Sequence, residues 1–147
     1  MAEIMNVSGL EDTIVRSVQV NRTRTPQEAL GATGRELYVN EAVVKTMPLG
    51  QGEEVTVGFF NLGRFVSDDE LKKEYDLRGL KPADPYSLSA VNEADPSFAD
   101  KHPNITHWMD ARGVWCYVAF SRWDEVRYVR VARYATYWSA HWWFASL

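Results

Sequence analysis

Cysteine is nearly absent from this chain. Cys116 is the single cysteine among 147 residues, so the chain cannot form an intramolecular disulfide and a reducing compartment is expected. The sequence also lacks any apolar run that approaches the roughly 20 residues needed to cross a bilayer. Residues 1–10 contain Glu3 and no basic flank, a composition that does not fit a signal peptide. We therefore expect a cytoplasmic protein with no membrane contact.

Motifs for nucleotide chemistry are missing as well. The sequence contains neither a phosphate-binding G-x-x-x-x-G-K-[S/T] loop nor the G-x-G-x-x-G fingerprint of dinucleotide sites. Three pairs of adjacent carboxylates occur, but each is explained by turn polarity or by favourable charge at a helix end. The pairs are Glu53-Glu54, Asp68-Asp69 and Asp124-Glu125. These observations assign no catalytic residue, no metal and no cofactor, and we expect a protein that is not an enzyme.

Aromatic residues, in contrast, are abundant and unevenly placed. They make up 13% of the chain, and all six tryptophans follow Ile105. Residues 101–147 carry six basic and three acidic side chains, whereas residues 1–100 carry ten basic and 17 acidic ones. The aromatic third of the chain is therefore also its basic third, although the net charge is −4. Such a field orients an anionic partner, unless the two parts neutralise each other within one fold.

The first hundred residues read as strands and short capped helices. Two capping boxes, Thr25-Pro-Gln-Glu28 and Ser67-Asp-Asp-Glu70, predict helix starts, and the second helix is expected to end near Leu77. The phrase Ala-Asp-Pro occurs at residues 83–85 and again at 94–96, which predicts helices over about 85–93 and 96–100. Further expected elements are strands over 13–20 and 54–62, a helix over about 40–46, and a weakly ordered lead-in over 1–11.

The remainder, residues 105–147, predicts an antiparallel meander. Segments 106–109, 114–123 and 126–134 are rich in β-branched and aromatic residues, and turn sequences separate them. Residues 138–147 offer a fourth strand at the end of the chain. We therefore predict one α+β domain spanning residues 1–147, in which short capped helices pack on a carboxy-terminal antiparallel sheet of three or four strands.

This sheet also provides the candidate binding surface. Strand alternation places Trp115, Tyr117 and Trp123 on one face of the middle strand. On the third strand, Arg127 falls on one face, and Tyr128, Arg130 and Tyr134 fall on the other. The predicted contact set is Trp115, Tyr117, Trp123, Arg127, Tyr128, Arg130 and Tyr134.

Three interpretations of this set remain open. Tryptophan, tyrosine and arginine dominate interface hot spots, which favours a module that binds a protein partner or self-associates. Stacking rings beside arginines also fit single-stranded nucleic acid. The simplest alternative is that the tryptophans only build the core, with arginine side chains lying over the rings.

A further alternative is a small enzyme or metal protein. Imidazole, carboxylate and thiolate groups are the usual zinc ligands, and four of them lie within fifteen residues: His102, His107, Asp110 and Cys116. Their spacing is poor, because no C-x-x-C or H-x-x-x-H pair presents two ligands on one face. Cys116 shares its predicted strand face with Val118 and Phe120, and apolar surroundings make a thiol unreactive.

Several phrases of the chain resemble a group of small uncharacterised bacterial proteins. The resemblance covers most of the chain after about Val20, and it implies no activity, substrate or catalytic residue. It indicates only that these phrases belong to one folding unit. The phrases are Arg78-Gly-Leu-Lys-Pro-Ala-Asp-Pro85, Asn92-Glu-Ala-Asp-Pro96, Phe98-Ala-Asp100, Thr106-His-Trp108, Trp115-Cys-Tyr117 and Trp142-Trp-Phe-Ala145.

Overall fold

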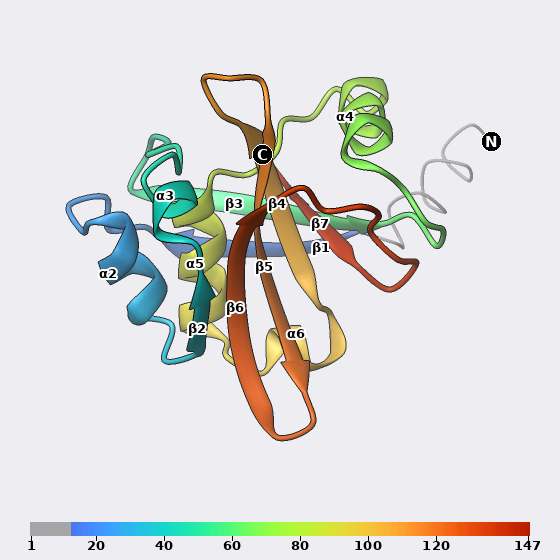
Figure 1. Cartoon of the computed structure of the whole chain (residues 1–147). Coiled ribbons are helices and arrows are strands. Elements are labelled where there is room, and N and C mark those ends of the chain that lie inside the picture. Colours follow the sequence, from blue (N-terminus) through green and yellow to red (C-terminus); the bar gives the residue numbers. More distant parts are fainter. Residues whose placement is uncertain (1–12) are drawn as a thin grey trace.

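A computed structural model describes residues 13–147, and the lead-in predicted to be weakly ordered, residues 1–11, lies outside this range. The described part is a mixed α/β structure built on one sheet (Figure 1). Its elements are β1 (Ile14–Gln19), α2 (Pro26–Gly31), β2 (Glu36–Val39), α3 (Glu41–Val44), β3 (Glu54–Asn61), α4 (Asp68–Leu77), α5 (Pro85–Ala94), α6 (Phe98–Lys101), β4 (Asn104–Met109), β5 (Trp115–Trp123), β6 (Val126–Arg133) and β7 (Trp143–Ser146).

The sheet has seven strands in the order β1-β3-β7-β4-β5-β6-β2, so the prediction of three or four strands was wrong. The predicted meander is present, since β4 pairs with β5 and β5 pairs with β6, both antiparallel. The early strands were predicted individually, but they join the same sheet instead of packing on it. Local alternation identifies a strand without identifying its neighbours, and for this reason the size of the sheet was underestimated.

The last strand shows this most clearly. The predicted fourth strand exists as β7, but it lies between β3 and β4 instead of following β6. It runs antiparallel to β3 and parallel to β4, and the backbone N–H of Trp143 donates to the carbonyl of Pro103 at 2.8 Å. This central position leaves Phe144 and Ala145 almost completely buried. The carboxy-terminal residues thereby connect the early strands to the meander.

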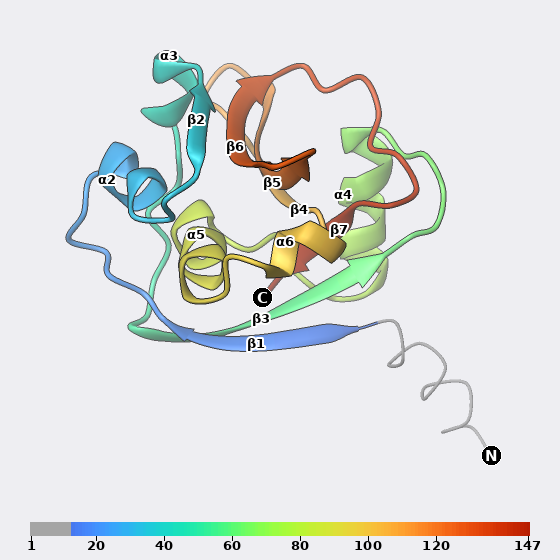
Figure 2. The same ribbon diagram turned by 90° about the horizontal axis from the view of Figure 1, so that it is seen from below.

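Helices cover the two faces of the curved sheet unequally. Helices α2, α3, α5 and α6 lie on one side, here called the inner face, whereas α4 lies on the opposite, outer face (Figure 2). Leu88 and Val91 of α5 belong to the same buried cluster as Val118 and Phe120 of β5. On the outer face, α4 packs through its buried residues Leu71 and Tyr75. The outer face of β6 and β2 has no helix over it in either view.

The predicted helix starts are largely confirmed. Both capping boxes form, with the Thr25 and Ser67 side chains accepting from the N3 backbone and the N3 glutamates bonding back. Asp84 caps α5 and Pro85 occupies its first turn. The second Ala-Asp-Pro phrase behaves differently, because α6 begins at Phe98. Asp95 instead ends α5, where its backbone N–H donates to Val91, and Ser97 is the N-cap residue of α6.

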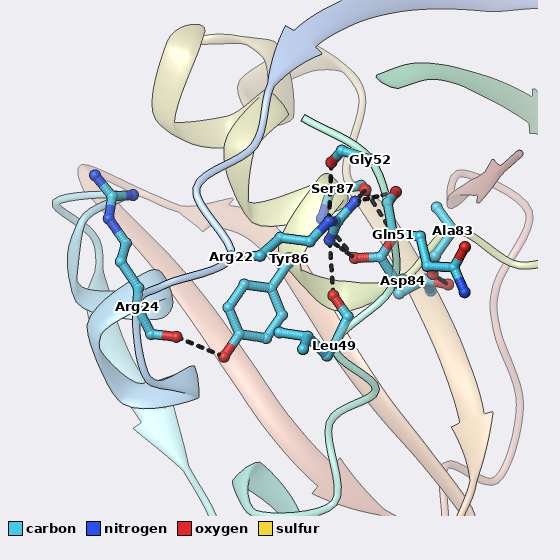
Figure 3. A network of polar contacts seen from close by, with 10 residues as sticks. Arg22, Arg24, Leu49, Gln51, Gly52, Ala83, Asp84, Tyr86 and Ser87 are labelled. Atoms are coloured by element: carbon cyan, nitrogen blue, oxygen red, sulfur yellow. Dashed lines mark hydrogen bonds and ion pairs between the residues drawn. The ribbon is translucent and has the colours of Figure 1, made fainter. Parts of the chain in front are cut away.

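A polar network fixes the start of α5 (Figure 3). The Arg22 guanidinium donates to the Asp84 carboxylate at 2.9 Å and to three backbone carbonyls in the loop of residues 49–52. Asp84 accepts at the same time from the backbone and the hydroxyl of Ser87. Because both charged groups are mostly buried and fully bonded, the network anchors the loop to the helix.

Within residues 13–147, no helix is long and apolar enough to cross a membrane.

Candidate aromatic interaction surface

The two faces of β5 and β6 differ as strand alternation predicts. Cys116, Val118 and Phe120 point to the inner face and are completely buried. Val129 and Val131 of β6 join them in the same cluster. The outer-facing residues of these strands are only half-buried or exposed over most of their length. The inner face of these strands is therefore buried in the core, whereas the outer face is buried at Ala119 and accessible elsewhere.

The exposed part of the outer face is aromatic. Tyr38, Trp123 and Val126 are 48%, 74% and 39% exposed, and with Tyr128 and Arg130 they line an open cavity of about 400 Å³. The pairing of β2 with β6 places Tyr38 beside Arg130, and the β5–β6 turn places Trp123 beside Val126. We call these five residues the aromatic patch. Exposed apolar groups gathered in one place, unlike scattered ones, mark an interaction surface.

Arg130 is the charged centre of the aromatic patch. Its guanidinium carbon lies 5.6 Å from the ring centroid of Tyr38 and 5.9 Å from that of Tyr128. The Tyr38 hydroxyl donates to Glu36 at 3.0 Å, and this bond raises the pKa of the phenol above its ordinary value. Among residues 13–147, no carboxylate forms an ion pair with Arg130. The patch therefore presents a cation held by ring faces and still open to an anionic group.

A second cavity continues the patch across the sheet. It measures about 240 Å³ and shares Tyr128 and Arg130 with the first cavity. Its far wall is formed by Tyr117, Trp138 and Trp142, whose rings meet edge to face at 4.9 and 5.4 Å. Burial raises the pKa of the Tyr117 phenol, which therefore stays protonated at neutral pH. Because the two cavities share Tyr128 and Arg130, we call them together the aromatic trough.

Arg127 belongs to a different environment from the rest of the predicted set. It lies on the helix-covered side of β6 and bonds to Asp100 of α6 at 2.7 and 3.0 Å. Arg122 of β5, which pairs with Arg127 in the sheet register, also reaches Asp100, at 3.4 Å. The hydrogen bonds from Arg127 hold the pKa of the Asp100 carboxyl below its ordinary value. Arg127 thus secures α6 to the sheet, on the face opposite Arg130.

We expect Arg127→Ala to raise the pKa of Asp100 toward its ordinary value near 3.8, measured by carboxyl NMR titration. A carboxyl whose pKa is depressed by folding stabilises the protein above its unfolded pKa, and that stability is lost as the pH falls through the folded pKa. The variant should therefore lose part of the acid dependence of its unfolding free energy below about pH 4. Arg130→Ala is the matched control, and an equal shift in both variants would contradict the assignment.

The two remaining members of the predicted set, Trp115 and Tyr134, line neither cavity. Trp115 stacks on His107 with ring centroids 4.1 Å apart, and its indole N–H donates to Asp69 of α4 at 2.8 Å. The Trp115 side chain therefore packs against other residues of the same chain and lies outside both cavities. Tyr134 is 74% exposed and follows the end of β6 with a positive φ of 63°. Strand alternation no longer determines its direction there, and it does not line either cavity.

The structure does not bring the four zinc-type residues together. His102 stacks on Phe98 and meets Trp143 edge to face, and Asp110 accepts from the backbone of its own turn. Cys116 is completely buried, with only weak contacts to Thr46 and Val114. Within the part of the chain that the structure describes, no three histidine, cysteine or acidic side chains are grouped so as to hold a metal ion.

His107, the fourth of them, forms a buried cluster that the sequence did not reveal. Its side chain is fully buried, and Nδ1 lies 2.8 Å from the Asp68 carboxylate. Trp138 donates its indole N–H to the same oxygen at 2.9 Å. Since a carboxylate only accepts, Nδ1 of His107 carries a proton. Asp68 therefore joins α4, β4 and the segment that forms the far wall of the trough.

Three residues that line the two cavities were not predicted from the sequence: Tyr38, Tyr137 and Trp142. Tyr38 lies about 90 positions from Arg130, and only the parallel pairing of β2 with β6 brings them together. The available signal was the short extended segment around Leu37 and Val39, which predicts a strand but not its neighbour.

We found no match to this chain among protein-family models, curated proteins or solved structures. The surface must therefore be interpreted from its own chemistry.

Proposed function

We propose that this chain is a binding module that takes up an extended, carboxylate-bearing segment of a partner protein in the aromatic trough. One observation supports the proposal most strongly. Of the four arginines in β5 and β6, Arg122, Arg127 and Arg133 are paired with carboxylates. Arg130 alone among the four stands unpaired, surrounded by exposed rings and at the junction of the two cavities.

The chemistry of the trough defines the segment. A carboxylate of the partner would pair with Arg130, where the neighbouring rings reduce access to water and strengthen the interaction. Aliphatic, proline or aromatic side chains on either side would pack on Trp123 and Val126 in one cavity and on Trp142 in the other. Exposed tryptophan and arginine at the centre of a concave surface are the residues that dominate binding energy.

Single-stranded nucleic acid fits this surface less well. Binding along a phosphate backbone uses several basic groups, each of which contributes to the salt dependence of the affinity. Of the residues that the structure describes, Arg130 is the arginine that lines the trough, and Glu36 and Glu125 line a neighbouring cavity. The rings remain suitable for stacking, but the charge is too small for tight contact with several phosphates.

The test begins with a phage library of random ten-residue peptides panned against the full chain. Recovered peptides are resynthesised with fluorescein, and their affinities are measured by fluorescence polarisation. We expect enrichment of peptides that combine an acidic residue with aromatic, aliphatic or proline residues. Trp123→Ala and Arg130→Ala should each weaken binding by about tenfold or more, as truncation of an interface hot spot does.

Tyr134→Ala is the matched control, because Tyr134 and Trp123 are both 74% exposed but only Trp123 lines the trough. It should leave the affinity within about twofold. Peptides whose binding is unaffected by both Trp123→Ala and Arg130→Ala, or no enrichment at all, would refute the proposal. Salt-sensitive binding of a random single-stranded oligonucleotide that is lost in Arg130→Ala would instead favour nucleic acid.

A further inference from the structure

The opposite edge of the sheet is formed by a long and regular strand, β1. All six of its residues pair in register with β3, and its sequence Ile-Val-Arg-Ser-Val-Gln contains no proline and no lysine. Folded proteins usually protect such edges with short strands, bulges, proline or charges, because unpaired backbone groups bind other chains. The edge strand on the other side, β2, has four residues. Apart from the inward-pointing Arg16, β1 therefore lacks these protective features over its six residues.

The register identifies which backbone groups of β1 face outward. Val20 donates its backbone N–H to the carbonyl of Glu53 at 2.7 Å, continuing the β1–β3 ladder. In an antiparallel pair the hydrogen-bonded positions alternate, so Val18 also points its backbone groups at β3. Ser17 and Gln19, the alternate positions, then point theirs away from the sheet. Within residues 13–147, no further strand lies beside them.

A groove runs next to this edge. It has a volume of about 590 Å³ and lies between the second half of β1 and the last turns of α5. The apolar part of its lining comes from Val18, Val20, Ala90 and Ala94, and the two alanines are one helical turn apart on α5. Figure 2 shows α5 lying over β1 on the inner side of the sheet. Small residues on the helix leave the space between helix and strand open.

An ion pair forms one wall of the groove. Arg24 and Glu93 lie with Nη1 and Oε1 2.8 Å apart, and both side chains remain about one third exposed. The hydrogen bond that Arg24 donates to Glu93 also raises the pKa of the Arg24 guanidinium. Because these two charges satisfy each other, the groove offers no net charge to an ionic ligand. Its specific features are the unpaired main-chain groups of β1 and the small apolar floor.

We infer that the groove binds an extended peptide of a partner protein, which adds to the sheet as a strand beside β1. Its main chain would pair with the N–H and C=O groups of Ser17 and Gln19. Every second side chain of an added strand points to the same face, so alternate residues enter the groove. Valine-sized or smaller side chains fit there, between Val18 and the alanines of α5. This site is separate from the aromatic trough.

A second copy of this chain meets a conflict in the two-fold register centred on Ser17. In the two-fold register that pairs Ser17 with its own symmetry mate, Arg16 of one copy lies opposite Val18 of the other. Arg16 points to the inner side, where its guanidinium covers the Phe98 ring at 4.7 Å. The Arg16 cation would then enter the apolar part of the groove. Inward-pointing charges on edge strands disfavour self-pairing in this way. A peptide with small aliphatic residues meets no such conflict.

The decisive comparison is between Ser17→Pro and Ser17→Ala. Both substitutions remove the hydroxyl contact with Thr56 at 3.1 Å, but only proline removes the outward N–H. Proline is tolerated at edge-strand positions whose N–H faces solvent, and circular dichroism with urea unfolding checks that the variant folds. Peptides recovered by panning the same library against the full chain should include a class that binds Ser17→Ala within about twofold of the unsubstituted chain and Ser17→Pro at least tenfold more weakly.

A second variant tests the groove without altering the strand. Ala94 is exposed at the end of α5, so Ala94→Leu fills the groove without disturbing the core. It should weaken the same peptide class about tenfold, whereas Ala111→Leu, at an exposed turn position, should not. N-methylation of alternate peptide amides should abolish binding when the methylated amide faces β1. The same peptides should bind Trp123→Ala normally, which separates this site from the trough.

Two outcomes would overturn the inference. The first is a library from which no peptide distinguishes Ser17→Pro from Ser17→Ala. The second is sedimentation equilibrium showing a dimer that Ser17→Pro dissociates and Ser17→Ala does not, since the edge would then serve a second copy. Either result leaves the proposed role of the aromatic trough untouched, because the trough is tested with its own variants.

Discussion

Gly50→Ala should destabilise the protein by about 3 kcal/mol or more, measured as the free energy of unfolding in urea. Gly50 has a φ of +70°, and a Cβ at this position would overlap the carboxyl group of Asp84. Asp84 cannot move away freely, because it caps α5 and is bonded to Arg22. The substitution therefore combines backbone strain with disruption of the polar network in Figure 3.

Gly34→Ala separates these two causes. Gly34 has almost the same φ, +72°, but a Cβ there would meet nothing within 4 Å. This variant carries the cost of the left-handed conformation alone, about 1 kcal/mol. Equal losses in the two variants would show that the Asp84 network adds no stability beyond the backbone conformation. A larger loss at Gly50 gives the combined cost of the overlap with Asp84 and the disturbed network.

Asp68→Ala should have a comparable effect, about 3 kcal/mol or more of unfolding free energy. The Asp68 carboxylate accepts hydrogen bonds from His107 and from Trp138, and all three groups are buried. Removing it leaves two donors in the protein interior without a partner, which costs more than either hydrogen bond contributes. It also removes a negative charge from the first turn of α4.

Asp69→Ala provides the neighbouring control. Asp69 is the next residue of α4 and also accepts from an indole, that of Trp115, but it is exposed to solvent. Water can replace the lost bond, so we expect a loss below about 1 kcal/mol. Trp138 also forms the far wall of the trough, and Asp68→Ala should therefore weaken trough-binding peptides more than Asp69→Ala does. Similar losses of stability in the two variants would exclude the buried cluster as a major source of stability.

The first turn of α4 illustrates which features the sequence revealed. Ser67 and Glu70 were predicted correctly as a capping box, because cap and partner are three residues apart and act locally. Asp68, between them, was explained by helix-end charge alone. Its contact with His107 spans 39 positions, and its contact with Trp138 spans 70. No local pattern records such a pairing, although it determines how α4 sits on the sheet.

The predicted contact set shows the same division. Alternation correctly placed Arg130 and Arg127 on opposite faces of one strand, because the side-chain period of a strand is two. It did not indicate that Asp100 neutralises Arg127 or that Tyr38 lies beside Arg130. These neighbours come from α6 and β2, which reach the meander only in the folded chain. Which residues remain available to a partner therefore depends on packing.

The features that local sequence patterns predicted correctly are the helix caps, the meander and the alternation of its two faces. Each depends on contacts between residues close in the chain or on a strict period. Only the folded chain shows that β7 lies in the middle of the sheet and that β2 and β1 form its two edges. Strand order and exposure depend on long-range pairing, for which neighbouring residues carry no signal.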